Sequence, residues 1–265
     1  MMIKQLTTAL IAGLVLAFSA APSFAASDED KGLAIAQQMK TRDAGWVDMT
    51  ASMKMVLRNK NGQESEREIR MKVLEVADDG DKSLSIFDRP RDVKGTAFLS
   101  FSHTSGADDQ WLYLPALKRV KRIASRNKSG PFMGSEFSFE DLASFEIEKY
   151  SYKFIKEEAC AMGTCFVVEQ YPTDKNSGYT KRIVWIDKTE YRMVKTAFYD
   201  RKNSLLKTLT TDDYQQYKGQ FWRPSAMQMV NHQSKKSTDL TYDTYQFGNG
   251  LSAADFNQNT LKRAR

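Results

Sequence analysis

The chain has 265 residues, with 39 basic and 33 acidic side chains, a formal net charge of +6 and two cysteines. This length fits one large domain or two small ones. The mild basic excess is typical of a solvated surface, and it is also compatible with anionic lipid headgroups or an acidic partner. No basic run interleaved with aromatic residues points to nucleic acid.

Residues 1–25 have the composition of a cleavable secretory signal. Lys4 precedes an apolar stretch over residues 9–18, and the small residues Ser23 and Ala25 suit a signal peptidase, so we expect cleavage after Ala25. The apolar stretch is shorter than the roughly 20 residues that span a bilayer, which disfavours an uncleaved anchor. We therefore expect residues 26–265 to form a single domain in the periplasm. Its charge is near +5, because Lys4 is the one charged residue removed.

One helix is expected directly after the signal. Ser27 can cap it, and the acidic residues 28–30 favour its first turn. Gly45 is expected to end it. Its narrow apolar stripe consists of Leu33, Ala36 and either Met39 or the apolar stem of Lys40.

From residue 46 onward, apolar and polar residues alternate with the period of two that indicates β-strands. A turn at Asn61-Gly62 separates the first two strands. Residues 78–81 break the pattern as a turn; their three aspartates lack the spacing of a calcium loop. The expected strands cover residues 47–57, 69–73, 83–89, 96–103, 110–114, 119–123, 146–156, 165–171, 179–187, 192–199, 205–217, 221–231 and 239–247. Short strands in regular succession predict one large antiparallel sheet or barrel.

Two segments interrupt the strands. Residues 125–145 are rich in Phe and Met, and Ser138 can start a short helix there. The tail at residues 251–256 can start another. The first segment is expected to be either a mobile lid or a fixed aromatic plug.

The two cysteines, Cys160 and Cys165, bracket four residues between strand-like flanks. Opposed positions of an antiparallel pair are close enough for a disulfide, and an oxidising compartment permits one. We predict a disulfide at the tip of a hairpin. A redox-active pair is the alternative, and a metal site is less favoured because no histidine lies nearby.

Motifs of catalysis are missing from the sequence. The two histidines, His103 and His232, lie far apart, and no Gly-x-Ser-x-Gly, phosphate-binding loop or His-Glu-x-x-His motif occurs. We expect no catalytic residue, no metal site and no cofactor. Abundant apolar residues stand out instead, with 12 Met and 15 Phe. The set Met49, Met53, Met55 and Met71 is expected to line either an apolar pocket or an ordinary core.

Two blocks carry a specific resemblance. Residues 95–123 and 130–142 closely resemble the outer membrane lipoprotein-sorting protein family, a LolA-like group often encoded beside exporters of the RND and MMPL types. The ending at residues 255–263 is also similar. The resemblance implies a mainly β (α+β) fold. Its core would be a curved, incompletely closed antiparallel sheet, a half-barrel like LolA and LolB, with helices plugging the concave face.

The same resemblance implies a periplasmic, monomeric carrier of lipid or lipoprotein acyl chains in outer membrane biogenesis. This carrier would work with an inner-membrane transporter of the RND or MMPL type. Residues expected to bind the acyl chain, as cavity or lid, are Met49, Met53, Met55, Met71, Phe98, Trp111, Leu112, Leu114, Phe132, Met133, Phe137, Phe139, Leu142 and Trp185. Residues expected to dock the transporter are Lys118, Arg119, Lys121 and Arg122. The alternatives are a docking subunit that carries no cargo and a lipid hydrolase.

Overall fold

The structure is a computed structural model that describes residues 26–259 and 261–263. The predicted signal at residues 1–25 and its cleavage site lie outside the described residues. The only α-helix of the described chain is α1 (Asp28–Arg42). Ser27 caps it as predicted, in a capping box with Asp30. The helix ends at Arg42, three residues before the predicted end at Gly45. The backbone N–H of Asp43 donates there to the carbonyls of Lys40 and Thr41.

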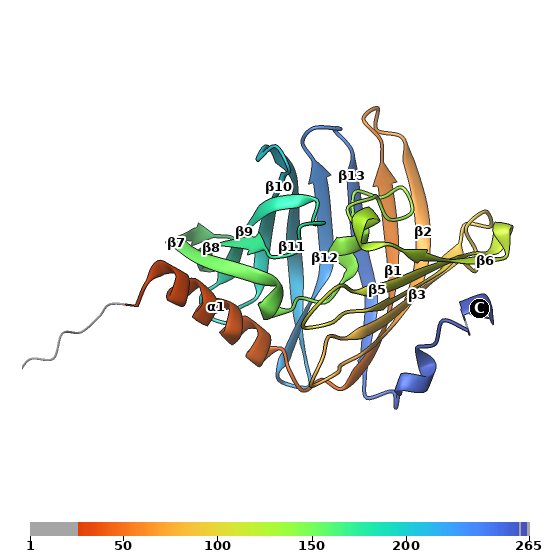
Figure 1. Cartoon of the computed structure of the whole chain (residues 1–265), viewed down its shortest axis with the longest axis horizontal. Helices are drawn as coiled ribbons and strands as arrows, with labels where there is room; N and C mark the ends of the chain where they lie inside the picture. Colours follow the sequence, from red (N-terminus) through yellow and green to blue (C-terminus); the bar gives the residue numbers. More distant parts are fainter. Residues whose placement is uncertain (1–25, 260, 264–265) are drawn as a thin grey trace, which may run out of the picture.

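Thirteen strands form one antiparallel sheet, which confirms the predicted β framework (Figure 1). The first six are β1 (Asp48–Arg58), β2 (Glu64–Leu74), β3 (Lys82–Arg89), β4 (Ala97–Phe101), β5 (Asp109–Leu114) and β6 (Arg119–Ile123). The other seven are β7 (Tyr150–Cys160), β8 (Gly163–Pro172), β9 (Tyr179–Asp187), β10 (Met193–Asp200), β11 (Leu205–Tyr217), β12 (Phe221–Asn231) and β13 (Ser237–Phe247).

Strand order shows how the chain builds this sheet. The order is β6-β5-β4-β3-β2-β1-β13-β12-β11-β10-β9-β8-β7, so two meanders join where β1 pairs with β13. The two edge strands, β6 and β7, do not pair with each other, so the sheet is curved but not closed. This is the predicted incompletely closed half-barrel.

The two faces of the sheet are covered by different segments. On the concave face, α1 packs over β7, β8 and β9, and residues 125–145 pack over the middle of the sheet. The predicted plugging helices are therefore one α-helix and an irregular segment with short 3₁₀ turns at Ser125–Asn127 and Phe139–Leu142. On the opposite face, Phe256 and Leu261 of the C-terminal tail pack against β3 and β4.

The predicted disulfide is present. Cys160 ends β7, Cys165 lies in β8, and their Cα atoms are 5.8 Å apart across the hairpin tip. Among the described residues, no helix combines the length and the apolar character needed to cross a membrane.

Candidate functional site

Residues 125–145, which we call the plug, form a short hairpin against the concave face. The N–H of Phe132 donates to the carbonyl of Phe137 at 2.7 Å, and the N–H of Phe139 donates to Gly130 at 3.1 Å. The hairpin turns at Met133 and Gly134, both with positive φ angles (49° and 80°). Glycine adopts such angles without steric cost, so Gly134 suits this turn.

Aromatic side chains of the plug enter the apolar core of the sheet. Phe132 is 1% exposed and lies 5.1 Å, between ring centroids, from Phe98 of β4. Phe87 of β3 and Phe139 of the plug each lie 5.8 Å from Phe132. Burying one such side chain stabilises the fold by about 1.5–3 kcal/mol. The plug thus occupies the place where the half-barrel would otherwise expose its apolar floor.

The structure brings most of the predicted ligand-binding residues together. The members that join one cluster on the concave face are Met53, Met55, Met71, Phe98, Leu112, Leu114, Phe132, Met133, Phe137, Phe139 and Leu142. Met49 lies in an adjoining cluster with Trp46, to which Met71 also belongs. Trp111 packs on the opposite face with Phe101. Trp185 donates to Glu158 and lies under the Lys195 ammonium group, away from the cluster.

A buried ion pair fastens the plug to β11. Nζ of Lys207 lies 2.6 Å from Oδ2 of Asp141, with side chains 4% and 5% exposed. The same ammonium group donates to the carbonyl of Glu136 at 2.8 Å. The hydroxyl of Tyr179 donates to the other carboxylate oxygen of Asp141 at 2.8 Å. Buried charges require such partners, because an unpaired charge is costly to remove from water.

Further polar contacts hold both sides of the plug. The N–H of Glu136 donates to Thr238 at 3.0 Å, and the side-chain amide of Gln110 donates to the carbonyl of Phe139 at 2.9 Å. Glu140 accepts from the N–H of Gly178 at 2.9 Å, and burial raises the pKa of this carboxyl. The plug is therefore held by polar groups as well as by apolar burial.

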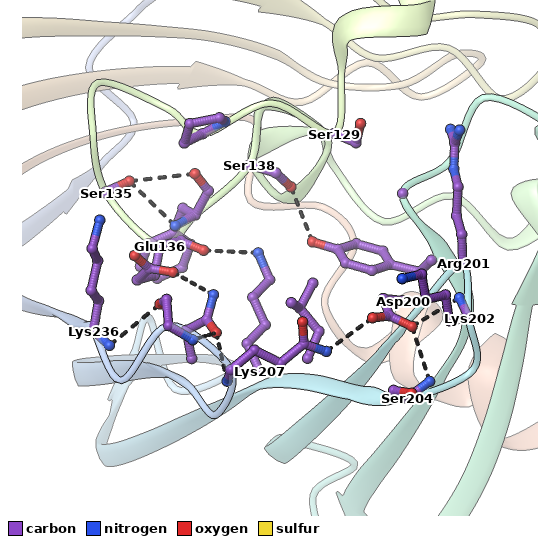
Figure 2. A pocket seen from close by; sticks show the side chains of 18 of the residues that line it. Ser129, Ser135, Glu136, Ser138, Asp200, Arg201, Lys202, Ser204, Lys207 and Lys236 are labelled. Carbon is purple, nitrogen blue, oxygen red and sulfur yellow. Dashed lines mark hydrogen bonds between the residues drawn. The ribbon is translucent and has the colours of Figure 1, made fainter. Parts of the chain in front are cut away.

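A cavity of about 880 Å³ lies between the plug and the rim of the sheet (Figure 2). The turns that follow β10 and β12 form its outer wall, and polar residues of the plug form the other wall. Lys207 reaches from β11 to the carbonyl of Glu136 in the plug (Figure 2). Phe137, Tyr179 and Leu206 line the cavity and also belong to, or pack against, the apolar cluster. The cavity thus adjoins both solvent-facing polar groups and the apolar core.

The predicted docking residues lie at the open edge of the sheet. Lys118 follows a 3₁₀ turn, and Arg119, Lys121 and Arg122 belong to the edge strand β6. All four are exposed, and Arg122 pairs with Asp109. Leu117, beside them, is 67% exposed.

The two histidines form no catalytic pair. Nδ1 of His103 lies 2.7 Å from Asp79, and this hydrogen bond raises the pKa of His103. His232 bonds to Thr208 in another part of the sheet. Across residues 26–259 and 261–263, no three His, Cys, Asp or Glu side chains are grouped so that they could hold a metal ion.

Sequence reasoning missed the polar anchors of the plug. Lys207 alternates with Leu209 and Thr211 on the inward face of β11, and all three are buried. A lysine at a buried strand position needs an ionic partner, so this pattern was a usable signal. Nothing in the sequence identified Asp141 as that partner, because 66 positions separate the two residues.

Comparisons with known proteins agree with this geometry. A crystal structure from Vibrio parahaemolyticus, described as an outer membrane lipoprotein-sorting protein domain, is 61% identical, with a TM-score of 0.87. The match covers 89% of this chain and 100% of that one. The chain belongs to the LolA-like outer membrane lipoprotein-sorting protein family. A family model described as an uncharacterized protein matches residues 79–263 of this LolA-like chain.

Two further structures share the fold of this LolA-like protein. A DUF1329 family protein from Desulfovibrio piger is 27% identical, with a TM-score of 0.84 over 89% of this chain and 100% of that one. A LolA superfamily protein from Nitrosomonas europaea is 18% identical, with a TM-score of 0.68 over 89% and 99% of the two chains. No curated protein sequence matches the chain.

Proposed function

We propose that this protein is a periplasmic carrier that binds an acyl chain of a lipid or lipoprotein on the concave face of its sheet. The observation that carries the proposal is the apolar cluster beneath the plug, which unites residues from eleven strands with five apolar side chains of the plug itself. Exposing a palmitoyl chain to water costs on the order of 12 kcal/mol. A carrier must therefore offer an apolar surface that is covered when cargo is absent.

The plug supplies such a cover, and its exchange for cargo is energetically feasible. Its five apolar side chains, Phe132, Met133, Phe137, Phe139 and Leu142, are partly or fully buried. At about 1.5–3 kcal/mol for each fully buried side chain, they contribute roughly 10 kcal/mol. A palmitoyl chain in the same place recovers a similar amount. Cargo can thus replace the plug at little net cost, and the plug can return when cargo leaves.

A transporter of the RND or MMPL type in the inner membrane is our proposed partner. The exposed basic residues Lys118, Arg119 and Lys121, beside exposed Leu117, offer a docking face at the edge strand β6. Charge reversal of the three residues should abolish pull-down of the transporter without weakening acyl binding. Retained pull-down would place docking elsewhere. We propose that the carrier acts as a monomer and performs no catalysis.

The carrier function is tested by extraction and by titration. Protein purified from cells should yield a bound lipid to organic solvent, identified by mass spectrometry. Fluorescent fatty acids of increasing length should bind about fourfold more tightly for each added methylene, since each contributes about 0.8 kcal/mol. Phospholipid incubated with the pure protein should remain intact, whereas a lipid hydrolase would cleave it. Absence of bound lipid together with absence of probe binding would refute the proposal.

A further inference from the structure

We propose that the basic rim of the 880 Å³ cavity beside the plug, formed by the turns that follow β10 and β12, binds the anionic headgroup of the cargo, so that the ligand is a phosphate-bearing amphiphile. This inference rests on the proposed carrier function, and it adds the chemical class of the ligand. The cavity has the size of a small-molecule site. It opens at the rim formed by the turns between β10 and β11 and between β12 and β13 (Figure 2).

Basic side chains on this rim lack acidic partners. Lys202 and Lys236 are exposed, line the cavity from different turns, and form no salt bridge within the part of the chain that the structure describes. Arg201, next to Lys202, donates only to the backbone carbonyls of Ser177 and Asn176, each at 3.1 Å. Arg201, Lys202 and Lys236 therefore line the cavity without a direct ion pair among the described residues, although hydrogen bonds and the nearby charge of Lys202 lower the pKa of Asp200.

The acidic residues of the cavity are already bonded to neutral donors. Asp200 accepts from the backbone N–H groups of Lys202 and Ser204 and from the side-chain amide of Gln233, each at 2.9 Å. Glu136 accepts from the side-chain amide of Asn231 at 2.7 Å. The charge of Lys207 is balanced by Asp141 behind the cavity wall. Neutral donors do not cancel the charges of these two carboxylates, but Arg201, Lys202 and Lys236 outnumber them, so the lining has a net positive charge that attracts an anion.

The apolar floor of the cavity connects a headgroup site to an acyl site. Phe137, Tyr179 and Leu206 line the cavity and contact the apolar cluster below the plug. An amphiphile whose chain replaced the plug would leave its headgroup at this rim, between Lys202 and Lys236. Lysines scattered over a surface would only increase solubility, whereas Lys202 and Lys236 line one cavity that adjoins the apolar core.

The test compares two soluble lipids with the same lauroyl chain. Lauroyl lysophosphatidylglycerol is anionic and monolauroylglycerol is neutral; both are titrated calorimetrically below their micellar concentrations, with glycerol phosphate as the headgroup without a chain. Because ion pairs at a partly exposed site are only partly screened, we expect the anionic lipid to bind about tenfold more tightly. The double variant Lys202→Glu/Lys236→Glu should abolish this preference and leave binding of monolauroylglycerol unchanged within about twofold.

The matched control is Lys218→Glu/Lys262→Glu, which makes the same charge change at exposed positions away from the cavity. It should keep the tenfold preference. A preference that survives in Lys202→Glu/Lys236→Glu, or that disappears equally in the control, would overturn the headgroup site. Equal affinity for glycerol phosphate alone would identify a free-phosphate site and also overturn it. Binding of neither lipid would refute the carrier function, and the headgroup site with it.

Discussion

The two segments that cover the concave face, α1 and the plug, are fastened by different kinds of contact. Helix α1 buries Ile35 and Ala36 against β7, β8 and β9. Its Gly32 lies so close to β7 that an added Cβ would be 2.8 Å from the backbone nitrogen of Phe154. The plug is held partly by buried polar groups, among them Lys207 and Asp141.

This difference indicates which cover can open. Lys207, Glu136, Ser138 and Tyr179 all line the 880 Å³ cavity, so polar groups released by the plug can be hydrated at once. Releasing α1 would expose an apolar face with no such compensation. We therefore expect the plug to be the exchangeable cover and α1 to be part of the permanent fold.

The largest expected effect comes from removing the buried anchor of the plug. Lys207→Met leaves Asp141 buried without its cation, which should destabilise the closed plug by about 3–5 kcal/mol. Hydrogen exchange should accelerate at the amide of Glu136, whose acceptor is Thr238 of β13, and stay unchanged in α1.

The double variant Lys207→Met/Asp141→Leu is the control for this anchor. It removes both charges and should recover part of the lost protection, because an apolar pair can replace a buried ion pair but the N–H of Ser138 loses its acceptor in Asp141. Equal acceleration of hydrogen exchange in α1 and the plug would show that the two covers open together. That result would contradict the expectation that the plug alone is exchangeable.

The second largest effect is expected where Gly32 of α1 lies against the backbone of β7. Gly32→Ala should lower the free energy of unfolding by roughly 2 kcal/mol, because the new methyl group meets backbone that cannot move aside. In an ordinary exposed helix, alanine stabilises by up to about 1 kcal/mol over glycine. Ala34→Gly, at an exposed position of α1, is the control and should cost about 1 kcal/mol. A gain in stability for Gly32→Ala in denaturant titrations would contradict the close packing.

The smallest effect concerns the seam where the two covers meet. Lys40 of α1 bonds there to Glu146 and to the carbonyl of Phe145, and the N–H of Asp81 donates to Ser144. Burial raises the pKa of Asp81 to about 6. Because this pKa is raised in the folded state, the carboxyl favours folding when protonated, and that contribution is lost as the pH rises from about 4 through about 6.

Asp81→Asn removes this titration and keeps an oxygen that can accept from the N–H of Val76. The variant should therefore be more stable than the parent by roughly 1–2 kcal/mol at about pH 8 and equally stable at about pH 4. Chemical denaturation at the two pH values measures this. If the variant and the parent differ in stability by the same amount at both pH values, the titration of Asp81 is not the cause of the pH dependence.

The sequence predicted the framework well because the period of two extends along nearly every strand. Alternation predicts an apolar surface that includes Met53 and Met55, and these two residues share one cluster with Phe98. Trp111 and Trp185 were grouped with them, but alternation alone does not say which face of a sheet is concave, and both lie elsewhere.

Other features depend on contacts between distant segments. Lys207 and Asp141 meet only once the plug lies across β11, and Lys202 and Lys236 share a cavity only because two turns lie at the same end of the sheet. Such contacts cannot be read from local patterns. The resemblance of residues 130–142 to the family marks the plug as a signature segment but does not show how it is anchored.

Hydrogen exchange of the plug during ligand binding tests the central claim most directly. When a saturating lauroyl lysolipid is added, the amides of Glu136 and Ser144, whose acceptors Thr238 and Ser102 lie outside the plug, should lose protection, while those of α1 keep theirs. This result would show that cargo replaces the plug. Binding of the lipid with unchanged or increased protection of the plug would contradict the exchange and identify the segment as a fixed part of the core.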